Sequence, residues 1–303
     1  MNTRILVTGA TGTIGGAVMR ALKAPSSDDR CTVVAGVRNA AKREQMTSDG
    51  IDAVPLDFDD PASVAAAMEG VDCLFLTTGY SVSMLIQSKT VLDAARKAGV
   101  RHVVHLGAWG SDTSPHQHLI WHAFVERYIE ALGFSWTHLQ PKTFMRNVLT
   151  ALRPGSTTLM QFYGDTKVGW IDPADIAAVA AAALLEPAAH GGQTYQLAED
   201  ARSGAEVAAI LAQVTGLPFT YAARDPHALA PILLKAGMEP TYANSLAAAT
   251  IAIAAGEAPG IGDTFDTVQQ VTGRPGTRWI DFAERHRERL IRTATAAVPP
   301  RTT

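Results

Sequence analysis

The chain has 303 residues, of which 47% are apolar and 18% are charged, and its formal net charge is -3 at pH 7. This balance is that of an ordinary globular protein and excludes a membrane-embedded or a charge-rich disordered chain. The slight negative charge argues against nucleic acid as a partner, because binding to phosphate backbones requires clustered lysine and arginine. The length predicts two closely joined folding units.

The chain also carries signs of its compartment. The first residues, MNTRILV, lead directly into a strand pattern, so no signal peptide is expected. Cys31 and Cys73 lie in or beside apolar strand patterns and are expected to be reduced core thiols. No apolar run is long and unbroken enough to span a membrane. We therefore expect a cytoplasmic protein without a membrane partner, and the sequence leaves open whether it forms a homo-oligomer.

Short apolar runs alternate with helical patterns through the first half of the chain. Strands rich in Val, Leu and Ile and separated by helices form parallel sheets that are covered on both faces. The pattern therefore predicts an α/β fold, with a doubly wound, mainly parallel Rossmann sheet. The expected strands are residues 4–9, 31–37, 52–57, 72–78, 102–107 and 134–140, and the expected helices are 12–22, 40–47, 61–68, 84–98 and 118–132.

The second half of the chain has a looser pattern. An alanine-rich helix at 171–187 and a strand at 193–198 indicate that the chain returns to the sheet there. The residues after this strand have a mainly helical pattern. The predicted division is a Rossmann domain at 1–150, joined by 165–200, then a smaller, mostly helical substrate or lid domain at 201–292 and a disordered tail at 293–303.

The stretch VTGATGTIGG joins the first strand to the first helix and places glycines at Gly9, Gly12, Gly15 and Gly16. Glycines in such a turn permit a tight bend, the approach of a pyrophosphate to the backbone, and close packing of helix on strand. The helix N-terminus then favours the phosphates. The alternative is an ordinary strand-to-helix turn, whereas a P-loop is excluded because no Gly-Lys-Ser/Thr is present after the turn.

The end of the second strand indicates which dinucleotide would bind. A site for NAD usually has Asp or Glu there, for the ribose 2′-hydroxyl, but the sequence GVRN supplies Arg38. A guanidinium group pairs with a 2′-phosphate, which a carboxylate would repel. Arg38 therefore favours NADP(H) as the cofactor, and the alternative is a solvated arginine at a strand end.

Several short stretches then occur in a fixed order over the first two thirds of the chain: VTGATGTIGGAV, GVRN, LDFDD, LFLTTG, VRHVVHLGA, WHAFVERYIEALGFSWTHLQPKTFMRN and IDPADIAAVAAAAL. In order and spacing they resemble the NmrA-like branch of the atypical short-chain dehydrogenase/reductase superfamily. The resemblance implies that NADP(H) lies across the carboxyl ends of the strands, with substrate between the Rossmann domain and the small C-terminal domain.

The resemblance also assigns roles to single positions. Asp57 and Phe58 would border the adenine, Thr77, Thr78 and Gly79 the adenosine ribose and diphosphate, and Leu106, Gly107 and Ala108 the nicotinamide ribose. Pro141, Phe144 and Asn147 would line the nicotinamide and substrate pocket, with Trp109 and Trp121 as further apolar walls or plain core residues. With the residues of the glycine turn, the expected cofactor set becomes Gly9, Thr11, Gly12, Thr13, Ile14, Gly15 and Arg38 together with these positions.

One departure from the superfamily concerns its Tyr-x-x-x-Lys pair, which handles the proton that accompanies hydride. The corresponding helix reads HLIWHAFVE, with His118 and His122 at the Tyr and Lys positions. The first interpretation makes these histidines catalytic, as proton donors or hydrogen-bond donors to the cofactor ribose. A metal site with Glu126 or a solvated polar face is the alternative, and no metal is expected.

The favoured function is an NADPH-dependent reductase that passes hydride to a small or medium, largely apolar electrophile such as a quinone, ketone, imine or activated alkene. Without a Tyr-Lys pair the acceptor must be electrophilic by itself or be protonated by His122 or water. One alternative is an NADP-binding protein that senses redox state without turnover. The other is a non-redox isomerase or cyclase on the same fold.

Overall fold

The structure is a computed structural model, and it describes residues 3–23 and 31–297. The chain forms two compact units, each assembled from separate stretches of the sequence. Unit 1 comprises Met1–Pro141, Pro173–Leu197 and Thr267–Arg274, and unit 2 comprises Lys142–Asp172, Ala198–Asp266 and Pro275–Thr303.

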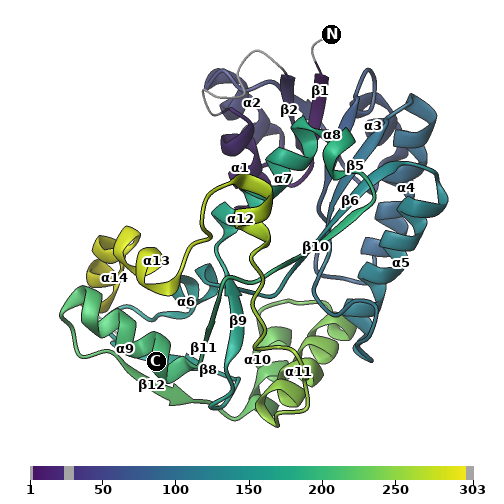
Figure 1. Cartoon of the computed structure of the whole chain (residues 1–303). Helices are drawn as coiled ribbons and strands as arrows, with labels where there is room; N and C mark the ends of the chain where they lie inside the picture. Colours follow the sequence, from purple (N-terminus) through teal and green to yellow (C-terminus); the bar gives the residue numbers. More distant parts are fainter. Residues whose placement is uncertain (1–2, 24–30, 298–303) are drawn as a thin grey trace. The chain divides into compact units, whose positions relative to one another are not determined.

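Unit 1 contains a sheet of seven parallel strands in the order β10-β6-β5-β4-β1-β2-β3 (Figure 1). The central strands are buried on both faces, as expected for a parallel sheet between layers of helices. The predicted doubly wound Rossmann sheet is therefore confirmed. The strands are β1 (Thr3–Val7), β2 (Cys31–Val37), β3 (Ala53–Pro55), β4 (Cys73–Leu76), β5 (His102–Leu106), β6 (Ser135–Pro141) and β10 (Gln193–Leu197).

The strand order reverses next to β1. From β1 the chain moves outward through β2 and β3, then returns to place β4 on the other side of β1. In open α/β sheets such a reversal opens a crevice beyond the carboxyl ends of the strands, where ligands bind. The turn after β1 and the turn after β4 therefore mark the expected place for a ligand.

The helices of unit 1 cover the two faces of this sheet. Helix α1 packs against α7, which also contacts α12, whereas α3, α4 and α5 contact one another in sequence (Figure 1). Apolar residues at helical spacing on α1, such as Ile14, Val18 and Leu22, form the buried face that makes this packing favourable. The helices are α1 (Thr13–Leu22), α2 (Ala40–Ser48), α3 (Pro61–Ala67), α4 (Met84–Ala98), α5 (Gln117–Ala131), α7 (Pro173–Leu185), α8 (Pro187–His190) and α12 (Thr267–Thr272).

Unit 2 is a smaller α+β assembly with its own core. One sheet has the order β11-β9-β7 and a second pairs β12 with β8. The rings of Trp170 and Trp279 meet edge to face at a centroid distance of 5.1 Å, and both side chains are fully buried. Its elements are β7 (Thr143–Phe144), α6 (Arg146–Ala151), β8 (Thr158–Gln161), β9 (Val168–Ile171), β11 (Asp200–Arg202), α9 (Gly204–Thr215), β12 (Thr220–Ala223), η1 (Pro226–Ala228), α10 (Leu229–Lys235), α11 (Pro240–Ala254), α13 (Trp279–Arg285) and α14 (Arg287–Ala294).

The chain passes from one unit to the other at positions that differ from the expected domain boundaries. Helix α7 and strand β10 do belong to the Rossmann unit, but unit 2 already begins at Lys142 and α12 returns to unit 1. Strands β7, β8, β9 and β11 were not expected from the sequence, because each has only two to four residues. In the tail, α14 extends to Ala294, and residues 298–303 lie outside the described residues.

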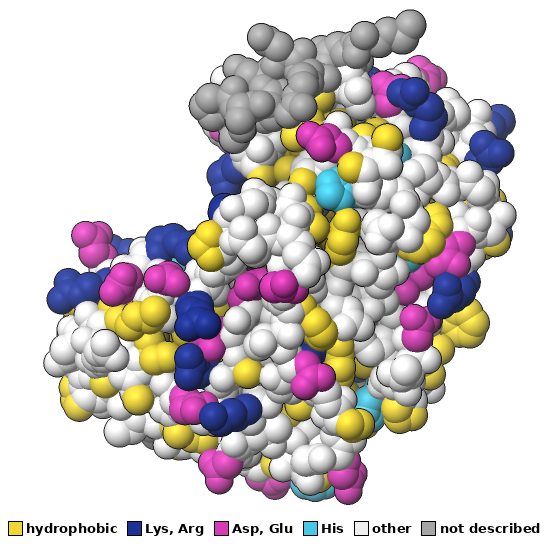
Figure 2. Space-filling view, viewed as in Figure 1, with side chains coloured by type: hydrophobic (Ala, Val, Ile, Leu, Met, Phe, Trp, Pro, Cys, Tyr) yellow, Lys and Arg dark blue, Asp and Glu magenta, His cyan; other side chains and the backbone are white. Residues whose placement is uncertain are grey.

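The surface carries both signs of charge. On the face shown in Figure 2, basic and acidic side chains are interspersed and do not gather by sign. In the part of the chain that the structure describes, every helix is too short or too polar to cross a bilayer.

Candidate functional site

The glycine turn after β1 exposes backbone at the start of α1. Gly9 has a φ of 59°, and the N–H of Gly12 donates to its carbonyl at 2.8 Å, which closes the turn. Gly12 is the N-cap of α1, without a side-chain hydrogen bond to the helix and without an acidic residue in the first turn. Gly9, Thr11, Gly12 and Thr13 are exposed. The free N–H groups and the helix dipole therefore suit an anionic ligand.

Close packing explains why further positions in the turn must be glycine. A Cβ on Gly15 would lie 2.3 Å from the Gly9 carbonyl oxygen, and one on Gly9 would lie 2.5 Å from Thr77 Cγ2. The buried Thr8 hydroxyl also accepts a hydrogen bond from the Thr77 N–H at 2.9 Å. The turn after β1 and the segment after β4 are thus held together at the strand reversal. Ile14 lies beside them with its side chain buried.

Two further predicted positions lie after β2 and β3. Arg38 comes directly after β2 with an exposed side chain, and Asn39 caps α2 by accepting a hydrogen bond from the Lys42 N–H at 2.9 Å. Asp57 and Phe58 lie half-buried in the loop after β3. The Asp57 carboxylate accepts from the Asp59 N–H at 3.1 Å, which fixes this loop. An arginine held at the end of β2 fits the predicted 2′-phosphate contact.

The remaining predicted positions of unit 1 lie after β4 and at or just after the carboxyl ends of β5 and β6, at the same edge of the sheet. The Gly107 N–H donates to the Leu139 carbonyl at 2.8 Å, and the Trp109 N–H to that of Pro141 at 3.1 Å, so the chain after β5 continues alongside β6. Trp121 is buried, which favours its interpretation as a core residue. The half-buried or exposed positions at this edge are Thr77, Thr78, Gly79, Leu106, Ala108 and Trp109, and Gly107 and Pro141 are buried.

The two predicted catalytic histidines lie on α5. His118 is buried, whereas His122 is partly exposed with its Nδ1 atom covered. Burial, together with a smaller effect of the neighbouring His116 on His118 and of His118 on His122, lowers the pKa of each histidine to about 4. Both imidazoles are therefore neutral at pH 7. A neutral ring suits hydrogen bonding to a cofactor better than proton donation.

Glu126 belongs to a buried polar cluster, although its sequence position had suggested only a metal ligand beside His118 and His122. Gln140 Nε2 donates to its two carboxylate oxygens at 3.2 and 3.1 Å, and the Ser111 hydroxyl donates at 3.4 Å. A Cβ on Gly107 would lie 2.5 Å from Glu126 Oε1, so glycine leaves room for the carboxylate. Burial raises the pKa of Glu126 to about 7. The only signal for this role in the sequence was an acidic residue four positions after His122 on the same helix.

Phe144 and Asn147 belong to unit 2, on β7 and α6. Phe144 is half-buried and Asn147 is exposed. Their roles as pocket residues remain a prediction.

A literal Tyr-x-x-x-Lys spacing also occurs in this unit, at Tyr163 and Lys167 between β8 and β9. Lys167 pairs with Glu206 at 2.7 Å, and the spacing lies in a turn rather than on the helix that bears His118.

Because several histidines are buried, we expect the folded protein to lose stability in acid. Burial lowers the pKa of His102 and of His118 from 6.5 to about 4. Their stabilising contribution is therefore complete above pH 6.5 and is lost as the pH falls toward 4. The raised pKa of Glu126 changes the free energy of unfolding in the opposite direction, but this single group is outweighed by the two histidines. We expect the free energy of unfolding to fall by about 3 kcal/mol or more between pH 6.5 and 4.5.

Urea denaturation at half-unit pH steps measures this effect. His102→Gln removes one titrating group and should reduce the slope by about 1.4 kcal/mol per pH unit. The same substitution at the exposed His227, His227→Gln, is the control for the exchange of a histidine. A stability that stays constant or rises toward pH 4.5 would contradict the prediction.

The fold and the glycine turn define a class: a doubly wound α/β protein with a dinucleotide-type anion site at the strand reversal. The model of the NmrA-like family matches residues 1–270. The chain belongs to the NmrA-like family, as its sequence motifs suggested.

Known relatives cover nearly the whole chain. It is 35% identical over 287 residues to an NAD(P)H azoreductase of Xenophilus azovorans, covering 93% of this chain and 97% of the relative. It is 31% identical over 281 residues to quinone oxidoreductase 2 of Escherichia coli, covering 90% and 95%. Among solved structures, an NADPH-dependent quinone oxidoreductase of Escherichia coli complexed with NADPH superposes with a TM-score of 0.78 at 29% identity, over 93% of this chain and 99% of the other.

Proposed function

We propose that the protein is an NADPH-dependent reductase that transfers hydride to a small or medium, largely apolar electrophile. The observation that carries the proposal is the open glycine turn at the strand reversal, with an exposed arginine directly after β2. Relatives over 30% identical are named as an azoreductase and a quinone oxidoreductase. The family and the site therefore point to the same chemistry.

The residues of unit 1 would hold the cofactor in a defined order. The N–H groups at the start of α1 would bind the pyrophosphate, and the exposed Arg38 would pair with the 2′-phosphate. The segments after β4 and β5 would border the two riboses. When bound, NADPH supplies the hydride.

The acceptors that fit best have an electron-poor double bond that accepts hydride without prior protonation. Quinones and activated alkenes have this property, whereas an imine would have to arrive already protonated, as an iminium ion. The neutral histidines on α5 fit such acceptors, because neither imidazole is in its acidic, protonated form at pH 7. The proton that completes the reduced product would come from water. Ketones, which need more help from an acid, become the weakest candidates.

His122 would act as a positioning group in this scheme. Its ring is neutral, partly exposed and held on α5, which contacts β6. A neutral imidazole N–H can donate one hydrogen bond to the nicotinamide ribose and so orient the hydride toward the acceptor. His118 is buried and would support the helix rather than touch the reactants.

An acceptor panel tests the function. The purified protein is incubated with NADPH and, in turn, a benzoquinone, a naphthoquinone, an azo dye, an imine and a ketone, while NADPH absorbance and product mass are followed. We expect NADPH consumption matched by product that is two electrons more reduced, fastest with the quinones or the azo dye. Binding of NADPH without conversion would favour a redox sensor. Conversion without NADPH consumption would favour an isomerase or cyclase.

Replacement of His122 tests its positioning role. His122→Ala is expected to lower kcat about tenfold, because one oriented hydrogen bond is lost, and to change the Kd for NADPH less than about threefold. Stopped-flow rates and fluorescence titration measure the two quantities. His227→Ala, at an exposed position of unit 2, is the control. A His122→Ala variant with full kcat on the best acceptor would remove His122 from the mechanism.

A further inference from the structure

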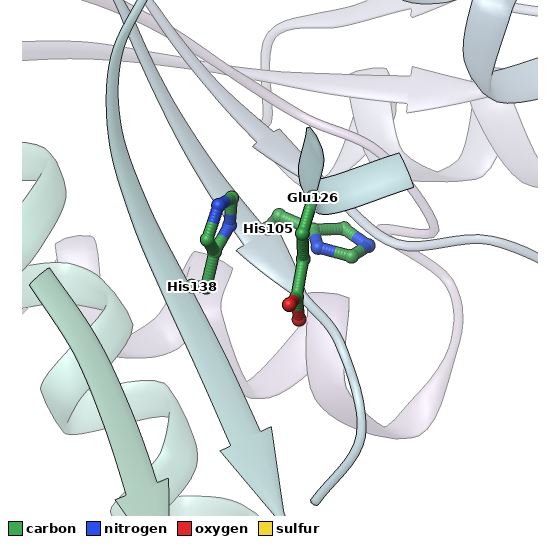
Figure 3. A group of neighbouring side chains, drawn as sticks. All are labelled: His105, Glu126 and His138. Atoms are coloured by element: carbon green, nitrogen blue, oxygen red, sulfur yellow. The ribbon is translucent and has the colours of Figure 1, made fainter. Parts of the chain in front are cut away.

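Three buried side chains of unit 1 gather between β5, β6 and α5 (Figure 3). His105 on β5 and His138 on β6 are direct neighbours in strand register, and Glu126 joins them from α5. One nitrogen of each histidine and one oxygen of Glu126 lie within 4.8 Å of one another. The exposed fractions of His105, Glu126 and His138 are 0%, 2% and 1%.

Three of the four imidazole nitrogens of this cluster lack a hydrogen-bond partner among the described residues. Among the described residues, none is within hydrogen-bonding geometry of either nitrogen of His105 or of Nδ1 of His138. Nε2 of His138 lies 3.3 Å from Glu130 Oε1. Buried polar nitrogens are unfavourable unless something replaces the water that they lost. Each neutral imidazole has one ring nitrogen with a lone pair, which can bind a metal ion or accept a hydrogen bond.

The spacing of the cluster fits a metal ion. Two imidazoles and one carboxylate are a common ligand set for zinc, with bonds of about 2 Å that place two bound imidazole centres about 5 Å apart. The ring centres of His105 and His138 are 5.8 Å apart. The ligand atoms would close around an ion through side-chain movements of about 1 Å, since ligand atoms of tetrahedral zinc are about 3.4 Å apart.

A second layer of polar groups surrounds these three residues. Gln140 and Ser111 donate hydrogen bonds to the Glu126 carboxylate and so fix its orientation. Glu130 lies against Nε2 of His138, which leaves Nδ1 of that ring as the ligand atom. Partners of this kind orient metal ligands and fix the histidine tautomer. The ionised form of Glu126 would supply a negative charge to a divalent cation, whereas the charge of Glu130 is already paired with Arg127 at 2.8 Å.

We propose that His105, Glu126 and His138 bind one divalent transition-metal ion, with zinc as the ion that the ligand set fits best. The ion would link β5, β6 and α5, and a water molecule would complete its coordination. This inference does not rest on the proposed reductase function. It also differs from the expectation of no metal and from the alternative of a site built on His118 and His122, because the two histidine ligands come from the strands.

Metal uptake by the folded protein tests the proposal. The protein is purified without a polyhistidine tag, dialysed against a chelator and then titrated with Zn²⁺ and, separately, Mg²⁺. We expect about one Zn²⁺ per chain with submicromolar affinity, a higher Tm with Zn²⁺, and no response to Mg²⁺. Replacement by Co²⁺ should give the intense visible absorption of a four-coordinate site.

Variants identify the ligands. His138→Phe and His105→Phe replace each buried imidazole by an apolar ring of similar size, and Glu126→Gln keeps the shape of the carboxylate. Each should weaken Zn²⁺ binding at least 100-fold and abolish the Co²⁺ absorption, because one ligand is lost. Circular dichroism and Tm without metal establish that each variant folds. His227→Phe, at an exposed position, should bind as the wild type does.

Two results would overturn the proposal. The first is a wild-type protein that takes up no Zn²⁺ and shows no change in Tm, which would make the cluster a neutral polar network. The second is Zn²⁺ uptake that persists in all three ligand variants, which would place the ion elsewhere. If one variant does not fold, the other two still decide the outcome.

Discussion

Gly15→Ala is expected to abolish measurable binding of NADPH, with a loss of at least about 100-fold in affinity, and to destabilise the protein by about 2 kcal/mol or more. The added Cβ would lie 2.3 Å from the Gly9 carbonyl oxygen and 2.8 Å from that of Thr8. Both neighbours are backbone atoms, so the turn itself must open. The N–H groups at the start of α1 would then lose their common direction toward the phosphates.

A graded series makes this prediction specific. Cβ atoms on Gly12 and Gly16 would meet backbone oxygens at 3.1 and 3.2 Å, so these substitutions strain the turn much less. Gly16→Ala is the control on the same helix and should keep NADPH affinity within about fivefold. Gly12→Ala should fold normally but weaken binding, because its methyl group projects from the exposed N-cap. Fluorescence titration with NADPH and thermal unfolding measure both effects. Wild-type affinity in a folded Gly15→Ala protein would place the cofactor elsewhere.

Arg38→Ala is expected to weaken NADPH binding about 100-fold while NADH affinity changes less than about threefold. Only NADPH carries the 2′-phosphate, and a charge-assisted pair with a guanidinium accounts for a difference of this size. The side chain is exposed directly after β2 and is accessible to a ligand there. The Kd values of both nucleotides, measured at two salt concentrations, give the cofactor preference and its electrostatic part.

A matched arginine controls for net charge. Arg96 is exposed near the end of α4, so Arg96→Ala removes the same charge at another place. It should leave the ratio of the two Kd values unchanged. Equal losses for NADPH and NADH in Arg38→Ala would show that the arginine does not recognise the 2′-phosphate.

The sequence predicted the Rossmann sheet well because its signals are local. Apolar runs at β1, β2, β4, β5 and β6 and the capped or glycine-ended helices between them mark elements without knowledge of their neighbours. Helix α4 was predicted at its observed bounds, since Gly99, with a φ of 85°, ends it. The short strands of unit 2 have no such signals, because their pairing depends on distant segments.

The polar cluster illustrates what local patterns miss. In a strand buried on both faces, alternation does not distinguish one side of the sheet from the other. His105 and His138 become neighbours only through the register of β5 with β6, and Glu126 reaches them because position 107 is glycine. The sequence showed the spacing of His118, His122 and Glu126 on one helix. It did not show that the strands supply the unpartnered imidazoles.

The order of segments within the two units has a consequence for biosynthesis. Strand β10, which pairs with β6 at the edge of the seven-stranded sheet, and helix α12, which contacts α7, are made long after β1. The Rossmann unit is thus incomplete until residue 274 has been synthesised, and unit 2 requires segments from both before and after β10. Such non-local pairing slows folding and leaves an open strand edge on the nascent chain. A gene cut at any one of these boundaries would divide at least one of the units and leave incomplete, aggregation-prone fragments, whereas insertion of a domain at an exposed loop would leave both folding units intact.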